Sequence, residues 1–185
     1  MTSTRGNETA GIGSRPRRIL VATDGTTTSR GAEQAAIELA AREGATLIVL
    51  SVIDPSRLRL PGGLFISRVD QFRAEREHTL GRVIDRARQL GISAQFLIWQ
   101  GDPGTVVLEA AEAEGADIVV VGSHDRGPVG RLLLGSVSSY VVSHAAMPVL
   151  VIRPGQRLAD VWPEGITAAD DTWILPEAPH VRRTA

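Results

Sequence analysis

The fold is decided by the apolar run Arg18-Ile19-Leu20-Val21-Ala22-Thr23 and the pair Asp24-Gly25 that follows it. A short apolar run closed by a turn signal is typical of a strand buried on both faces. Thr27, Thr28 and Ser29 then offer helix N-caps, and alanine and leucine recur at helical spacing until Gly44 ends the pattern. The stretch therefore predicts a buried strand, a tight turn and a helix.

The same unit recurs along the chain. Further buried strands are predicted at 45–53, 92–100, 116–122 and 147–152, and helices at 67–90, 102–114 and 135–144, with a loop at 54–66. Strands without polar alternation are buried on both faces, as a parallel sheet covered by helices requires. We expect an α/β fold, a doubly wound five-stranded parallel sheet of order 3-2-1-4-5, with its ligand site between strands one and four.

Composition excludes several kinds of chemistry. The chain has 185 residues, 43% of them hydrophobic, a net charge of -1, no cysteine and no lysine. Thiol chemistry, a lysine-dependent phosphate loop and Schiff-base catalysis are therefore excluded. The charge predicts no nucleic-acid partner. No apolar run resembles a signal peptide or membrane span, so we expect a cytoplasmic protein without membrane contact.

Both ends of the chain differ in composition from its middle. Residues 1–16 are small and polar, which predicts disorder, residues 17–154 form the predicted domain, and residues 155–185 form a polar tail. The tail contains Trp162 and Trp173. These side chains either cover apolar surface of the domain or dock a partner.

Ligand binding is expected in the stretch GSHDRGPVGRLLLGSV, residues 122–137. It follows a predicted strand and precedes a helix, so backbone N–H groups and a helix N-terminus can face an anion. Ser136 adds a hydroxyl, and Arg126 and Arg131 add positive charge. The stretch predicts a phosphate site, although Asp24-Gly25 taken alone also fits an ordinary turn.

This stretch resembles the universal stress protein family, whose ATP-binding members carry Gly, two residues, Gly, nine residues, Gly, then Ser or Thr. The chain has Gly122, Asp125 and Gly135-Ser136 at the matching positions. The flanking sequences VVVGSH, LLGSVS and HAAMPVLVIR also resemble the family. The similarity covers about residues 17–154.

The resemblance implies a fold like that of the adenine nucleotide alpha hydrolases, ATP or a related adenine nucleotide as ligand, a regulatory role in stress response and a homodimer paired through the last strand. It implies that Asp24 and the backbone of Val52 contact the adenine side. The main-chain contacts it implies near ribose and phosphates fall on Val121, Gly122, Gly135, Ser136 and Val137. We also expect Asp125 and Arg126 to lie at the nucleotide.

Asp125 departs from the family pattern because it stands where the second glycine is expected. Aspartate tolerates a left-handed backbone, so the turn can survive. Its carboxylate, however, would repel a phosphate by about 4 kcal/mol at about 4 Å and an effective dielectric of about 20, which weakens binding about a thousandfold. A bound Mg²⁺ could make Asp125 a ligand instead, and Arg126 could compensate its charge.

Two alternatives to a nucleotide-binding module remain open. In the first, Asp125 closes the phosphate site and the protein acts as a nucleotide-independent dimer through protein contacts. In the second, the protein is a slow ATPase in which Asp125 or His124 positions water. No nucleophile elbow or clustered metal ligands are present in the sequence, so no catalytic residues are predicted.

Overall fold

The computed structural model describes residues 15–57, 64–123 and 135–162. Its elements in chain order are β1 (Arg18–Ala22), α1 (Arg30–Glu43), β2 (Thr46–Ile53), the 3₁₀ turn η1 (Pro55–Arg57), α2 (Leu64–Gln89), β3 (Ala94–Gln100), α3 (Pro103–Ala113), β4 (Ile118–Gly122), α4 (Ser136–His144), β5 (Val149–Ile152) and α5 (Leu158–Val161).

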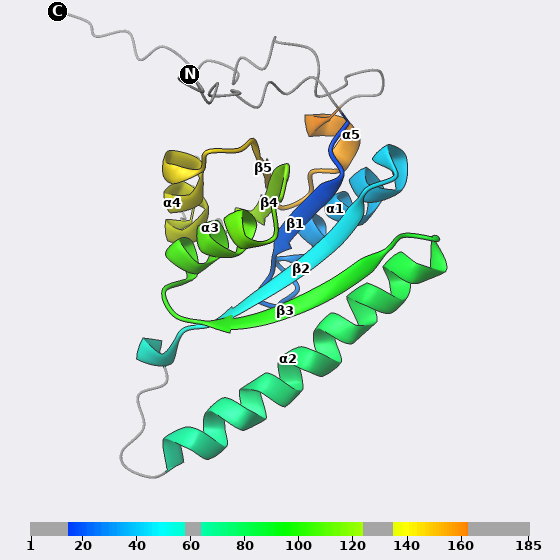
Figure 1. The fold of residues 1–185 in the computed structure, drawn as a ribbon. Coiled ribbons are helices and arrows are strands. Elements are labelled where there is room, and N and C mark those ends of the chain that lie inside the picture. Colours follow the sequence, from blue (N-terminus) through cyan, green and yellow to red (C-terminus); the bar gives the residue numbers. More distant parts are fainter. Residues whose placement is uncertain (1–14, 58–63, 124–134, 163–185) are drawn as a thin grey trace, which may run out of the picture.

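The described strands form one sheet of order β3-β2-β1-β4-β5, in which every neighbouring pair is parallel. Helices α1, α2 and α5 pack on one face and α3 and α4 on the other (Figure 1). This confirms the predicted α/β class and strand order. The order reverses between β1 and β4, which pair from Ile19–Ile118 to Ala22–Val121.

Burial follows position in the sheet. The interiors of β1 and β4 are fully covered, whereas Gln95 and Phe96 of β3 are exposed and most of β5 is half-buried. The prediction that all five strands are buried on both faces is therefore wrong for β3 and β5. Both are edge strands, and the helices cover the centre of the sheet more completely than its margins.

Most predicted element bounds differ from the observed ones by two residues or fewer. The start of α2 is the exception, because the helix begins at Leu64 and not at residue 67. The glycine pair ending at Gly63 is the last helix-breaking signal before it. The apolar residues that follow, which the predicted loop 54–66 includes, can join the helix.

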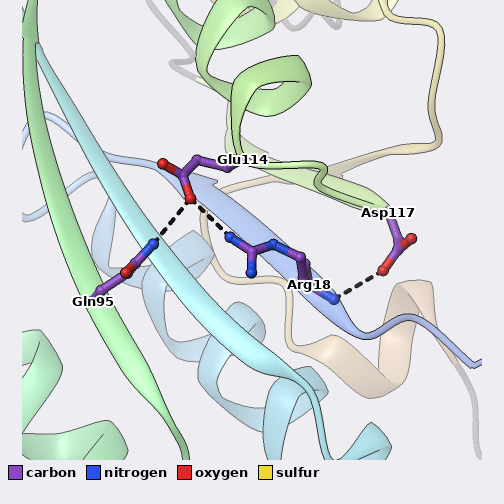
Figure 2. Close-up of polar contacts among 4 residues, drawn as sticks. All are labelled: Arg18, Gln95, Glu114 and Asp117. Atoms are coloured by element: carbon purple, nitrogen blue, oxygen red, sulfur yellow. Dashed lines mark hydrogen bonds and ion pairs between the residues drawn. The ribbon is translucent and has the colours of Figure 1, made fainter.

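A polar network joins the amino ends of three strands (Figure 2). Glu114, after α3, accepts hydrogen bonds from Arg18 Nη2 at 2.8 Å and Gln95 Nε2 at 3.0 Å. Asp117 Oδ2 accepts the backbone N–H groups of Arg17 and Arg18 at 2.7 and 2.9 Å. These bonds satisfy backbone donors where β1 begins, at the edge of the sheet opposite the predicted ligand site.

Residues after β5 also contribute to the core. Leu158 and Trp162 are each 4% exposed and pack in the same cluster as α1 and α2. Arg42, in the last turn of α1, donates from Nη1 to the Trp162 carbonyl at 3.0 Å and lies 6.0 Å from the centre of the indole ring. For Trp162, this confirms the interpretation that the side chain covers apolar surface.

Several sequence predictions fall outside the described residues. Trp173 and all but the last two residues of the segment 1–16 do so. The predicted domain limits therefore stay a prediction. Among the described helices, none combines the length and the apolar character needed to cross a membrane.

Candidate functional site

The turn after β1 is organised around Asp24. Its Oδ1 atom accepts the backbone N–H of Thr26 at 3.0 Å, the Thr26 hydroxyl at 2.7 Å and the hydroxyl of Ser29. Asp24 itself is half-buried. The turn therefore holds one oxygen of this carboxylate with three donors, and the orientation of the side chain is set before any ligand arrives.

Ser29 stands at the N-cap position of α1, but its side chain makes no cap hydrogen bond. The hydroxyl turns back to Asp24 Oδ1 and to the Thr26 carbonyl at 3.2 Å. The expectation that a hydroxyl caps this helix is thus wrong for Ser29. The hydroxyl donates its proton to a charged carboxylate, which forms a stronger hydrogen bond than a neutral acceptor does, and this bond orients Asp24.

Gly25 takes a left-handed conformation with φ of 70°. A Cβ atom built there would lie 2.8 Å from Arg76 Nη1 and 3.0 Å from Thr79 Cγ2, both on α2. The turn is therefore packed against α2, and glycine is needed both for its φ and for the closeness of this contact.

The end of β4 lies against the same turn. A Cβ atom built on Gly122 would lie 3.7 Å from Ala32 Cβ and 3.9 Å from both Ser29 Cα and the Thr28 carbonyl oxygen. Val121, which precedes it, is buried and pairs with Ala22. The structure therefore brings Val121 and Gly122 to the point where the chain leaves β1 toward Asp24.

Helix α4 begins with Gly135 as its N-cap, at φ −59° and ψ 158°. Ser136 is exposed, and Val137 is half-buried against the cluster that α3 covers. The first N–H groups of a helix have no acceptor within the helix. Because β4 and β5 are parallel, α4 runs back from the carboxyl end of β4 to the amino end of β5. The first N–H groups of α4 therefore lie at the carboxyl ends of the strands, where the sequence predicts them.

Val52 lies near the carboxyl end of β2 and pairs with Trp99 of β3. Asp24 follows β1, and Val52 lies near the end of the neighbouring β2, so both are at the carboxyl ends of the strands. Gly122 ends β4, on the other side of β1. The remaining predicted site residues, Asp125 and Arg126, lie outside the described residues, as does His124. Within the described ranges, no three His, Asp or Glu side chains come together as metal ligands.

Three residues around the turn are not among the predicted site residues. Thr23 and Glu33 form a buried hydrogen bond of 2.7 Å, and Arg76 reaches Gly25 from α2. Glu33 could have been recognised, because it falls within the apolar stripe of α1 that contains Ala32 and Ala36. A charged residue at such a position needs a buried partner. No local signal identifies Arg76, since its contact depends on how α2 packs.

The match to known families agrees with this geometry. The sequence profile of the Universal stress protein family matches residues 16–153. The chain belongs to this family. A universal stress protein from Thermus aquaticus is 34% identical over 146 residues, which cover 74% of this chain and 98% of the relative.

Solved structures of universal stress proteins share the fold. One from Burkholderia pseudomallei is 31% identical with a TM-score of 0.63, and the match covers 76% of this chain and 96% of that one. Another, a universal stress protein solved in complex with cAMP, is 26% identical with a TM-score of 0.58, over 76% of this chain and 98% of that one. An adenine nucleotide is thus bound by at least one structural relative.

Proposed function

We propose that this universal stress protein binds an adenine nucleotide, ATP, at the carboxyl edge of the sheet between β1 and β4, and that it acts as a regulatory binding module in stress response. The observation that carries the proposal is the contact between Gly122 and the turn of Thr28 and Ser29, at the place where the strand order reverses. Open α/β sheets bind their ligands at this kind of position.

The donors and acceptors at this edge suit a nucleotide. The Asp24 carboxylate, oriented by the hydrogen bonds of its turn, would accept a hydrogen bond from the adenine amino group. The backbone of Val52 would contact the base. The first N–H groups of α4 and the Ser136 hydroxyl would face the phosphates, where a helix N-terminus favours negative charge.

Asp125 and Arg126 would determine which phosphate chain is accepted. A carboxylate near the phosphates disfavours ATP unless Mg²⁺ joins the two. We therefore expect ATP to bind more tightly with Mg²⁺ than without it, and the Asp125→Gly variant to lose most of this dependence.

The test is calorimetric titration of the whole chain with ATP, with and without Mg²⁺. Micromolar binding is expected in wild type, and Asp24→Asn is expected to weaken it at least tenfold. Asparagine keeps an oxygen for the turn but replaces the second carboxylate oxygen with a donor. Asp85→Asn, on the exposed side of α2, is the matched control and should bind as wild type does. Absence of binding in both conditions would contradict the proposal.

We further propose a homodimer paired through β5. This strand is the outer one beside β4, and its Val149 and Val151 side chains are only half-buried. Apolar edge strands favour pairing with another strand, and a two-fold axis closes such a pair. Light scattering at tens of micromolar should give twice the chain mass, and a monomer there would refute the pairing.

A further inference from the structure

We infer that Glu33 is a positioning residue for the nucleotide site, acting through Thr23 on the turn that holds Asp24. The inference rests on the proposed function and adds a buried relay to it. The relay runs from the Glu33 carboxylate in α1, through the Thr23 hydroxyl after β1, to the backbone N–H of Gly25.

Each step of the relay is a short hydrogen bond in a covered place. Thr23 Oγ1 donates to Glu33 Oε1 at 2.7 Å, and Gly25 N donates to Thr23 Oγ1 at 2.9 Å. Glu33 is 3% exposed and Thr23 is 6% exposed. Water therefore has little access to the bond between Thr23 and Glu33, and a lost partner there is not readily replaced. The bond from Gly25 N is partly buried.

The direction of the bonds gives Glu33 its role. An ionised carboxylate can only accept hydrogen bonds, so the single proton of the Thr23 hydroxyl is donated to Glu33. Its lone pairs are then left to accept from Gly25 N. Because Gly25 follows Asp24 directly, this bond fixes the backbone on one side of the Asp24 carboxylate, while Thr26 and Ser29 hold its Oδ1 atom from the other side.

The Thr23 hydroxyl has a second possible hydrogen-bond partner, Ser51, so an acceptor is needed to fix its direction. In the register that pairs Ala22 with Leu50, the next residues, Thr23 and Ser51, lie beside each other. Val21 and Val49 pack in the same cluster, so by strand alternation Thr23 and Ser51 face the same helices. Ser51 is fully buried, and its hydroxyl has no hydrogen-bond partner in the described structure. Without Glu33, the Thr23 hydroxyl could turn toward Ser51.

The position of Glu33 in its helix favours a charged acceptor. Glu33 lies in the first turn of α1, where the helix dipole stabilises a negative charge. The Arg76 guanidinium lies close to Gly25, 2.8 Å from a Cβ atom built there. An apolar residue of similar size, such as leucine, would fill the space but would offer the Thr23 hydroxyl no acceptor.

The experiment compares Glu33→Leu with Glu33→Gln, and uses Glu38→Leu on the exposed face of α1 as control. Affinities for adenosine, ATP and inorganic tripolyphosphate are measured by calorimetry at a temperature where circular dichroism shows each variant to be folded. Glu33→Leu should weaken adenosine and ATP by the same factor, about tenfold for a lost hydrogen bond to a charged group. Tripolyphosphate binding should not change, because it lacks the base.

Glutamine retains an acceptor oxygen, so Glu33→Gln should recover affinity to within about threefold of wild type. Glu38→Leu should bind as wild type does. Unchanged adenosine affinity in folded Glu33→Leu would overturn the inference, and so would an equal loss of tripolyphosphate binding. If Glu33→Leu does not fold, Thr23→Val against Thr23→Ser makes the same comparison, with serine retaining the hydroxyl.

A second measurement separates this inference from the proposed function. Amide hydrogen exchange at Gly25, followed by NMR without nucleotide, should be at least tenfold faster in Glu33→Leu and near wild type in Glu33→Gln. If wild type binds no adenosine or ATP, the proposed function fails and the functional part of the relay fails with it. If wild type binds but Gly25 exchange is the same in all variants, only the relay is refuted.

Discussion

Replacement of Gly25 by alanine tests how closely α2 packs on the Asp24 turn. Alanine at φ of 70° costs about 1–2 kcal/mol in the left-handed region. The added methyl group would lie 2.8 Å from Arg76 Nη1 and 3.0 Å from Thr79 Cγ2. Because the guanidinium ends a flexible side chain and can move aside, the overpacking costs about 1 kcal/mol, the low end for such sites. The alanine also reduces the freedom of the unfolded chain, which stabilises the protein by about 0.4–1 kcal/mol. We expect a net loss of about 1–2.5 kcal/mol in the free energy of unfolding.

The assay is urea unfolding followed by circular dichroism, with two controls. Gly44 has φ of 69° and no atom within 4 Å of a built Cβ, so Gly44→Ala isolates the backbone cost, about 1 kcal/mol. In an Arg76→Ala background, the cost of Gly25→Ala should fall because one of the two close atoms is gone. If Gly25→Ala costs no more than Gly44→Ala, the packing argument is refuted.

Two further predictions concern packing away from the turn. Trp162→Ala should lower the free energy of unfolding by about 3 kcal/mol, because a large buried aromatic side chain is removed; a loss below about 1 kcal/mol in urea unfolding would contradict the assignment of Trp162 to the core. Gly104→Ala should destabilise by about 1–2 kcal/mol, since its Cβ would lie 2.7 Å from Tyr140 Cδ1. Gly81→Ala, in α2 with no atom nearby, should instead stabilise by up to about 1 kcal/mol. If both substitutions stabilise the protein in thermal or urea unfolding, Tyr140 moves aside for the methyl group at position 104 and the packing argument is wrong.

Much of the fold could be predicted because its signals are local. Apolar runs, the Asp102-Pro103 helix start and the glycines after helices are all visible in the sequence, and Asp102 does cap α3. The four-residue helix α5 could not be predicted, since so short a helix has no periodicity. Its position depends on the packing of Trp162 against α1, and such a tertiary contact is not visible in the sequence.

The candidate site was predictable only in part. Resemblance to a family pointed to Asp24, Gly122 and the start of α4, and the structure places these at one edge of the sheet. Their contacts with a ligand stay predictions. The buried pair of Thr23 and Glu33 was not predicted, because the role of a polar residue in an apolar stripe cannot be assigned until its partner on another element is known.

The chain enters and leaves its described core at the amino ends of the strands, away from their carboxyl ends. Arg17 is held where β1 begins, and Trp162 is held at the end of α1, next to the start of β2. Attachment to a sensor surface or fusion to a reporter protein at residue 15 or 162 would therefore begin at the amino edge of the sheet. A surface prepared in this way would hold the carboxyl ends of the described strands away from the point of attachment.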